Sequence, residues 1–385
     1  MTPVGGLPDD IRHRFPIFGH RVYLNSCSQG AVSDVVRAAY ESYLGTLEAE
    51  GSLWSHWTDR AERLRGAYAR LLHADPSSIA VTTSASAGAA SVASALDFGV
   101  RDTVVTTDLE FPTIGQIWHA QERHGARVVH VESTEDNLLP LDRLAAAIDD
   151  RTAIVSVTHV CYRNGSLTDV EAVVRLAHER GALVLLDSYQ AAGAVPIDVG
   201  ALGVDFVVGG ALKYLLASPG VGYLYANPAT TGHLVPTSTG WFADEDIFAM
   251  RIDAYRPAAT ARRFESGTPP IPSVYAATAG VELMLEIGVE RTAVHVAALN
   301  DRLIDEVAAL GGVIATPKDS ARRGPLVAVA ATDAEQLVDR LAEDGIVTSS
   351  RDGNLRISPH CYNNDEDIDR LLIALRVNRD LLRMR

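Results

Sequence analysis

The sequence predicts an α/β protein, with a large domain built on a mostly parallel sheet flanked by helices and a smaller α+β domain behind it. Near-continuous apolar runs alternate with helical stretches rich in Ala, Leu, Glu and Arg, and such runs are typical of strands buried on both faces. At 385 residues the chain is also too long for one small core. Because the texture changes after about residue 255, we expect an N-terminal arm over 1–20, a large domain over 21–254 and a small domain over 255–385.

Each element is expected from its composition and from its place in this alternation. Short β-branched or apolar runs predict strands at 79–82, 103–106, 127–131, 153–158, 182–186, 204–208, 313–315 and 326–329. Longer stretches with helical composition predict helices at 86–96, 169–180, 274–288, 292–310, 333–344 and 365–383. The N-terminal arm is expected to pack on the small domain.

The bulk composition disfavours several classes of partner. A formal net charge of −15 argues against nucleic acid, which needs a basic face, and against an anionic membrane surface. No apolar stretch is long enough to span a bilayer, and the N-terminus shows no secretory signal. Three widely separated cysteines fit a reduced compartment better than a disulfide framework. We expect a cytoplasmic protein without nucleic-acid or membrane partners, and we predict no metal site.

Lys213 is the first candidate for chemistry. It is one of only two lysines in a chain with 34 basic residues, and it follows a predicted buried strand and the glycine pair Gly209 and Gly210. Arginine stays protonated and cannot form a Schiff base, whereas a buried lysine with a lowered pKa can. A solitary lysine without context is more often a surface or salt-bridge residue, so its surroundings decide.

Three further features follow predicted strands, which is where open parallel sheets bind ligands. Asp187 ends the strand at 182–186, and a buried carboxylate there needs a cationic partner, which a protonated pyridine nitrogen would supply. Gln190 is placed to donate to a ring oxygen. Residues 83–88 turn from a strand into a helix, whose free N–H groups and hydroxyls bind phosphate. The loop at 108–113 carries Phe111, an aromatic suited to stacking on a flat ring.

Each of these features alone also fits an ordinary helix cap or core residue. Their conjunction in one order is more specific, and it extends over segments at 22–26, 82–88, 109–113, 158–165, 187–190, 210–214, 263–269 and 356–360. In these segments the chain resembles the class V aminotransferase family of fold-type I pyridoxal 5'-phosphate (PLP) enzymes, which includes cysteine desulfurases, selenocysteine lyases, kynureninase and isopenicillin N epimerase-like proteins. The resemblance covers nearly the whole chain. It implies the PLP-dependent transferase fold, PLP as cofactor, an amino-acid substrate and a homodimer with the active site at the subunit interface.

The resemblance also implies a role for each matched residue at the cofactor. Lys213 would hold PLP as a Schiff base and move the α-proton of the substrate. Asp187 would pair with the pyridinium nitrogen, and Gln190 would contact the phenolic oxygen. The other implied cofactor contacts are Phe111 on the ring and Ala85, Ser86, Ala87 and Thr268 at the phosphate, with Thr268 coming from the neighbouring subunit.

On the substrate side, Arg356 matches the arginine that binds the α-carboxylate, a task suited to a planar bidentate donor. A surface ion pair is the alternative for Arg356, and the apolar strand pattern around it disfavours that reading. Asn25 and Trp241 either face the substrate or serve the structure.

The chain departs from the family pattern around the cofactor. Tyr162 stands where relatives commonly have an asparagine near the ring oxygen, Gly210 replaces a phosphate-binding serine, and Leu212 replaces a histidine before the lysine. Tyr189 or Thr268 would then compensate for the lost phosphate contacts.

The predicted function is a PLP-dependent lyase that breaks the carbon–sulfur bond at Cβ of cysteine or a cysteine conjugate. Cysteine desulfurases carry a nucleophilic cysteine in the loop before the arginine, but residues 347–354 contain none, which disfavours a persulfide-forming enzyme. An amino-acid epimerase or aminotransferase, of secondary metabolism for example, is the alternative. A non-catalytic regulatory protein of the same fold is disfavoured because Lys213 and Asp187 are both present. Side-chain specificity is expected in loops at 51–59 and 237–250.

Overall fold

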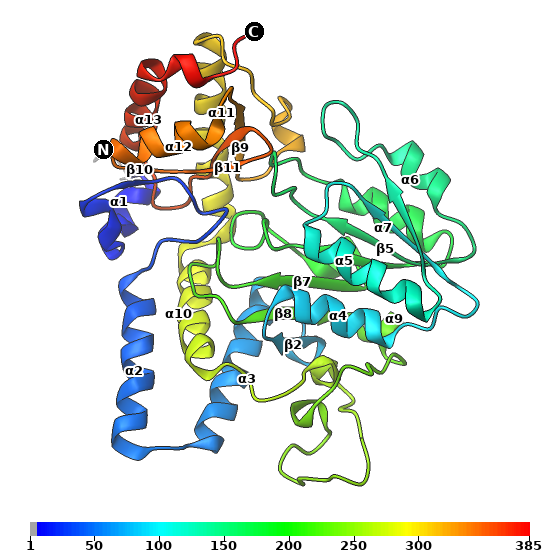
Figure 1. Ribbon diagram of the computed structural model, residues 1–385. Helices are drawn as coiled ribbons and strands as arrows, with labels where there is room; N and C mark the ends of the chain where they lie inside the picture. Colours follow the sequence, from blue (N-terminus) through cyan, green and yellow to red (C-terminus); the bar gives the residue numbers. More distant parts are fainter. Residues whose placement is uncertain (1–5) are drawn as a thin grey trace.

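The computed structural model describes residues 6–385, and its centre is a seven-stranded sheet with the order β2-β8-β7-β6-β5-β3-β4 (Figure 1). Neighbouring strands pair in parallel except at β8, which runs antiparallel to both β2 and β7. The strands are β2 (Ile79–Thr82), β3 (Thr103–Thr107), β4 (Arg127–Val131), β5 (Thr152–Thr158), β6 (Leu183–Asp187), β7 (Phe206–Gly210) and β8 (Gly222–Ala226). The predicted α/β class with a mostly parallel sheet is confirmed.

Alternate side chains of the central strands enter two different apolar clusters, as the period of two in a strand requires. Ile154, Leu185 and Phe206 face the helices α4 (Ala85–Ala95) and α5 (Pro112–Ala120). Their neighbours along each strand face the opposite side. That side is covered by α3 (Trp54–Leu71), α6 (Leu141–Ala147), α7 (Val170–His178) and α10 (Ile271–Ile287). Burial on both faces explains why the strands read as continuous apolar runs.

The smaller C-terminal unit contains a three-stranded antiparallel sheet with the order β11-β12-β9. Its elements are α11 (Val289–Ala309), β9 (Val327–Ala330), α12 (Ala334–Glu343), β10 (Ile346–Val347), β11 (Ser349–Arg351), β12 (Asn354–Ile357) and α13 (Asp365–Val377). Strand β1 (Val22–Tyr23) pairs in parallel with β10, so the N-terminal segment is tied to this unit. Arg12 also binds Asp367 of α13 at 2.7 Å, consistent with the arm packing there. Residues 1–5 of the predicted arm lie outside the described residues.

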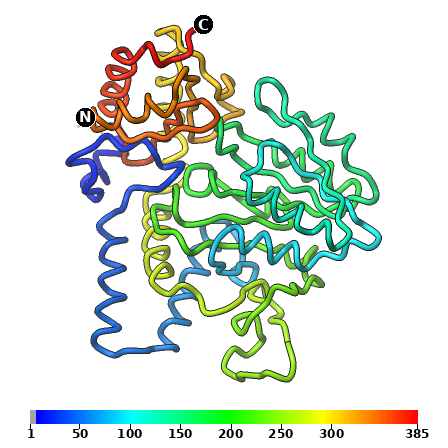
Figure 2. Tube along the Cα trace, in the orientation of Figure 1, coloured from blue at the N-terminus to red at the C-terminus, as the bar shows by residue number. Residues whose placement is uncertain are grey.

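Two long helices, α2 (Asp34–Glu50) and α3, form a hairpin that packs on α10 (Figure 1). Apolar side chains of α10 belong to the same cluster as those of the large sheet. The division after residue 254 stays a proposal, and this packing favours a division nearer residue 288. Figure 2 shows the segment between α9 (Pro228–Thr231) and α10 looping away from the body at the end opposite the C-terminal unit.

Two local expectations are corrected by the structure. The predicted loop at 51–59 is mostly helical, because α3 begins at Trp54; Leu53 at its N-cap makes no side-chain cap bond, so the sequence lacked a start signal. The predicted strand at 313–315 is an irregular edge in which Ile314 forms only an isolated bridge with Val329. Pro317, which has no N–H to donate, follows this edge closely.

Most of the remaining predicted strands and helices are present with ends shifted by a few residues, whereas β8 had not been predicted. Among residues 6–385, the structure contains no helix with the length and apolar character needed to cross a bilayer.

Candidate active site

A cavity of about 260 Å³ lies at the carboxyl ends of the central parallel strands. The ends of β5 and β6, the turn after β7 and the N-terminus of α4 meet there, which is the edge where open parallel sheets bind ligands. Its walls are Ser84, Ala85, Ser86, Phe111, Thr113, Ile114, Thr158, Val160, Tyr162, Asp187, Tyr189, Gln190, Leu212 and Lys213. The structure thus brings six of the eleven predicted site residues together around one space: Ala85, Ser86, Phe111, Asp187, Gln190 and Lys213.

Lys213 enters the cavity from the turn after β7, and the turn is held by the N-terminal segment. The N–H of Gly30 donates to the carbonyl of Leu212 at 2.9 Å. A Cβ on Gly30 would lie 2.3 Å from the carbonyl oxygen of Lys213, so only glycine allows this approach. Burial is the main cause that lowers the pKa of Lys213, to about 8, and the nearby charge of Arg356 lowers it further. About a fifth of the amine is therefore neutral near pH 7.4, far more than for an ordinary lysine, as a nucleophile or base requires.

No hydrogen bond or ion pair to the Lys213 amine is found within residues 6–385. Its Nζ instead lies 4.4 Å from the ring centre of Tyr189 and 5.7 Å from that of Phe111. The Lys213 amine can therefore react without first breaking an ion pair.

Asp187 is the last residue of β6, and it is buried in the wall of the cavity. Its carboxylate accepts the N–H of Tyr189 at 2.9 Å, which fixes its orientation. Burial raises the pKa of Asp187 more than the Tyr189 N–H and the charge of Lys213 lower it, and no salt bridge reaches it among the described residues. A ligand with a cationic N–H group would stabilise the charged form.

Gln190 lies beside Asp187 and is only partly satisfied. Its Nε2 donates to the carbonyl of Cys27 at 3.1 Å, while its Oε1 is buried without a partner. The amide nitrogen has a second hydrogen to donate. Buried polar atoms in native proteins are normally paired, so an orphaned one in a cavity wall indicates a ligand contact.

The phosphate end of the predicted site is the start of α4. Ser84 is the N-cap, and its Oγ accepts the N–H of Ala87 at 3.0 Å. Ala85 and Ser86 line the cavity, and this bond does not use their amides; it uses the amide of Ala87, which does not line the cavity. Gly88 lets the helix approach the sheet, because a Cβ there would meet Val208 at 3.2 Å.

Three predicted residues lie at the rim of the cavity or away from it. Phe111 lines the cavity with its side chain 43% exposed, in an edge-on contact with Tyr162 at 5.0 Å between ring centres. Thr268 is exposed and does not reach the cavity of its own chain. Trp241 packs edge-on against Trp54 of α3, 5.5 Å between ring centres, also away from the cavity.

Arg356 lies on β12 and is buried next to the cavity. It donates to the carbonyl of Tyr162 at 3.0 Å and to the hydroxyls of Ser349 at 3.0 Å and Ser28 at 3.3 Å. Its Nε has no partner, and no carboxylate pairs with it among the described residues. Asn25 bridges to Ser358, two residues beyond Arg356, so it lies on the same side of the site.

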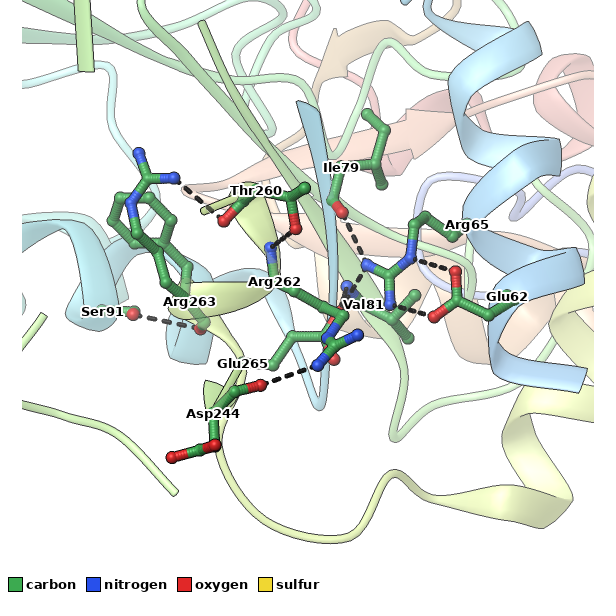
Figure 3. A network of polar contacts seen from close by, with 11 residues as sticks. Glu62, Arg65, Ile79, Val81, Ser91, Asp244, Thr260, Arg262, Arg263 and Glu265 are labelled. Atoms are coloured by element: carbon green, nitrogen blue, oxygen red, sulfur yellow. Dashed lines mark hydrogen bonds and ion pairs between the residues drawn. The ribbon is translucent and has the colours of Figure 1, made fainter. Parts of the chain in front are cut away.

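A buried ion-pair network anchors the segment that carries Thr268 (Figure 3). Arg65 of α3 binds Glu265 at 2.6 Å and Glu62 at 2.9 Å, and it donates to the carbonyl of Ile79 at 2.6 Å. Glu265 also accepts the N–H of Val81 at 2.9 Å, so β2, α3 and the turn before residues 266–268 are locked together.

The sequence-based prediction does not include a buried carboxyl group beside Asp187. Glu110 is buried, and its Oε1 accepts the N–H of Thr158 at 2.5 Å while its Oε2 has no partner. Burial and the charge of Asp187 together raise the pKa of Glu110. The available signal was a carboxylate directly before Phe111 in a loop that follows a buried strand, and we had given that loop's role to Phe111 alone.

Comparisons with known proteins agree with this geometry. Residues 25–371 match the family model described as aminotransferase class-V. An uncharacterized aminotransferase of Bacillus subtilis is 34% identical over 94% of this chain and 95% of its own length. A kynureninase of Pseudomonas fluorescens is 28% identical over 89% of this chain and 85% of its own length.

Solved structures share the fold. A cysteine desulfurase from Thermococcus onnurineus superposes with a TM-score of 0.88 at 23% identity, covering 96% of this chain and 98% of the other. The cystine C-S lyase C-DES superposes with a TM-score of 0.85 at 24% identity, covering 94% and 99%. A buried acidic residue, an unpaired lysine and a helix N-terminus around one cavity fit PLP, which brings a cationic ring nitrogen, an aldehyde and a phosphate. The chain belongs to the class V aminotransferase family of PLP-dependent enzymes.

Proposed function

We propose that this enzyme is a carbon–sulfur β-lyase acting on L-cysteine or a cysteine conjugate, without a persulfide-forming cysteine. The observation that carries the proposal is the arrangement of Lys213, Asp187 and Arg356: a neutral-capable amine and a buried carboxylate in one cavity, with an arginine free of carboxylate partners beside it. When bound, PLP supplies an electron sink that stabilises negative charge developing at the substrate Cα.

Three residues of the chain have separate roles around the cofactor. Arg356 is placed to bind the substrate α-carboxylate with its planar, bidentate donors. The Lys213 amine removes the proton from Cα and carries it within the cavity. Asp187 keeps the ring nitrogen protonated by offering it a buried negative partner. The thiolate that leaves Cβ takes up the proton held by Lys213 and departs as a thiol. The released enamine is then hydrolysed by water to pyruvate and ammonia.

The segment before Arg356 supports the lyase over a desulfurase that stores sulfur on the protein. Residues 349–357 form a tight hairpin, with β11 paired to β12 through a turn at Asp352 and Gly353, both at positive φ. Ser349, the hairpin residue nearest the arginine, accepts a hydrogen bond from it. No cysteine lies in this hairpin.

Epimerisation and transamination begin with the same proton removal, so they are the alternatives that an assay must separate. We therefore propose to incubate the PLP-loaded enzyme with L-cysteine, L-cystine, cysteine S-conjugates and L-kynurenine. Kynurenine is included because kynureninases are among the relatives. Pyruvate, ammonia and thiol appearing together from a cysteine compound support the lyase. A D-amino acid, a keto acid that keeps the side chain, or turnover of kynurenine alone contradicts it.

We also propose a homodimer in the cytoplasm, with Thr268 of one subunit reaching the phosphate of the other. Thr268 is exposed in the single chain, and the loop before it exposes Phe248, Met250 and Ile252. The three cysteines are free and buried, as a reducing compartment allows. Light scattering should give twice the chain mass of 41.2 kDa, and a monomeric holoenzyme would contradict the dimer.

A further inference from the structure

The ring of Tyr189 occupies the space where a side chain at Gly210 would lie. A Cβ built on Gly210 would stand 2.5 Å from Cε2 of Tyr189 and 2.6 Å from both its Cζ and its hydroxyl oxygen. Real Cβ atoms do not approach other heavy atoms this closely, so a side chain at 210 would force the Tyr189 ring out of its present position. The Tyr189 ring thus occupies space that is open because residue 210 has no side chain.

The strand pairing shows what lies next to this hydroxyl. Gly210 of β7 is directly opposite Gly222 of β8. A Cβ on Gly222 would lie 3.1 Å from the backbone nitrogen of Ala85, at the start of α4. Directly opposite residues of an antiparallel pair have Cβ atoms on one face, roughly 5 Å apart. The Tyr189 hydroxyl and the start of α4 thus lie next to opposite residues of one strand pair, and both line the same cavity.

The hydroxyl itself is available as a donor. Tyr189 lines the cavity together with Ser84, Ala85 and Ser86. Its backbone N–H is committed to Asp187, but its hydroxyl makes no hydrogen bond within the part of the chain that the structure describes. Burial, with a smaller contribution from Asp187, raises the pKa of Tyr189 to about 12, so the hydroxyl keeps its proton at neutral pH.

We propose that the Tyr189 hydroxyl donates a hydrogen bond to the phosphate of PLP, beside the N-terminal amides of α4, and replaces the hydroxyl that a serine at position 210 would supply. This inference rests on PLP occupying the cavity as described above. It makes Tyr189 a cofactor-binding residue and explains why position 210 is glycine in this chain.

Tyr189→Phe tests the hydroxyl alone, since the ring that packs on Gly210 is kept. Titration of the apoprotein should show PLP binding weakened on the order of ten- to a hundredfold, the scale of one hydrogen bond to a charged group. Binding of pyridoxal, which lacks the phosphate, should change by less than about twofold. Tyr225→Phe is the matched control, because it removes a tyrosine hydroxyl from the same sheet outside the cavity wall.

The exchange of the pair gives a second, independent test. Gly210→Ser alone should weaken PLP binding, because its Cβ collides with the tyrosine ring. Tyr189→Ala combined with Gly210→Ser should bind PLP more tightly than Tyr189→Ala alone, since the serine hydroxyl then enters the vacated space. Such coupling between two substitutions is the signature of a shared role.

The outcomes separate this inference from the assignment of the cofactor. If the wild-type protein forms no PLP adduct at Lys213, the cofactor site itself is wrong. If the wild-type protein binds PLP but Tyr189→Phe binds it equally well, or loses PLP and pyridoxal to the same extent, the tyrosine only fills space and the inference is overturned.

Discussion

Two cations of the large domain, Arg65 and Lys213, differ in the groups that surround them. Arg65 directs its Nε, Nη1 and Nη2 at two glutamates and a carbonyl, and these partners raise its pKa despite burial (Figure 3). Lys213 is partly buried with two aromatic rings near its amine, and desolvation lowers its pKa to about 8. The chain supplies hydrogen-bond acceptors for Arg65, whereas the amine of Lys213 is left to interact with a ligand.

The difference teaches how to separate structural charges from functional ones in this fold. A buried charge whose partners all come from the chain holds segments together, as Arg65 holds α3, β2 and the turn at Glu265. A buried group whose polar atoms have no partner carries a desolvation free energy, and a ligand that pairs with those atoms removes this penalty. Arg356 belongs with the second kind, because its acceptors are two hydroxyls and a carbonyl, and its Nε is unpartnered.

The largest expected effect follows from removing Lys213, the cation for which the chain supplies no hydrogen-bond acceptor among the described residues. Lys213→Ala should abolish the borohydride-stable PLP adduct and lower turnover by about a thousandfold or more, because both the attachment point and the base are lost. Peptide mass mapping and turnover measure the two effects. Lys318→Ala, at the chain's only other lysine and on the surface, is the control and should change neither. An adduct surviving in Lys213→Ala would place the chemistry elsewhere.

Removing a partner of Arg65 should lower the stability of the fold more than it affects catalysis. Glu265→Gln removes the buried negative charge beside Arg65 and should lower the free energy of unfolding by about 3 kcal/mol, as expected when one partner of a buried pair is lost. Urea denaturation measures it. Arg37→Ala, which breaks the exposed pair with Glu41, should cost about 0.5 kcal/mol or less. Equal losses in the two variants would mean that burial does not distinguish these pairs.

Arg356 makes three hydrogen bonds but pairs with no carboxylate among the described residues. The variant Arg356→Lys tests whether it binds the substrate. It keeps the charge and removes the planar two-donor geometry, so kcat/KM should fall about ten- to a hundredfold, mostly through a higher KM. Steady-state kinetics with the substrate that the assay panel selects measures it. The midpoint of urea unfolding should stay near that of the wild type. A fall in kcat with an unchanged KM would show that the arginine does not bind the substrate.

The smallest effect is a pH dependence set by Lys213. Because burial lowers its pKa to about 8, the neutral amine fraction rises with pH and reaches one half there. The initial rate of PLP adduct formation by the apoprotein should therefore rise several-fold from pH 7 to pH 8 and level off by about pH 9. Trapping with borohydride at short times measures the rate. A rise that continues to pH 10 would indicate an ordinary, solvated lysine.

Much of the site was readable from the chain because its chemistry requires particular residue types at strand ends. Asp187 after an apolar strand, the small residues before Ser86 and the isolated Lys213 each carry a local signal. The helix α3 carried no such signal at its start, since Leu53 offers no cap, and its stability comes from packing against α10 and the sheet. Residues 51–59 were misread as a loop for that reason.

Residue patterns along the chain are enough to predict the fold class, the family and six of the residues that line the cavity, because buried strands and the chemistry at strand ends leave local signals. Only the tertiary structure decided which buried groups are satisfied. It paired Arg65 with Glu265 across 200 residues, buried Glu110 beside Asp187, and laid the ring of Tyr189 over Gly210. These relations depend on distances between segments far apart in the chain, and no local pattern of residues encodes such distances.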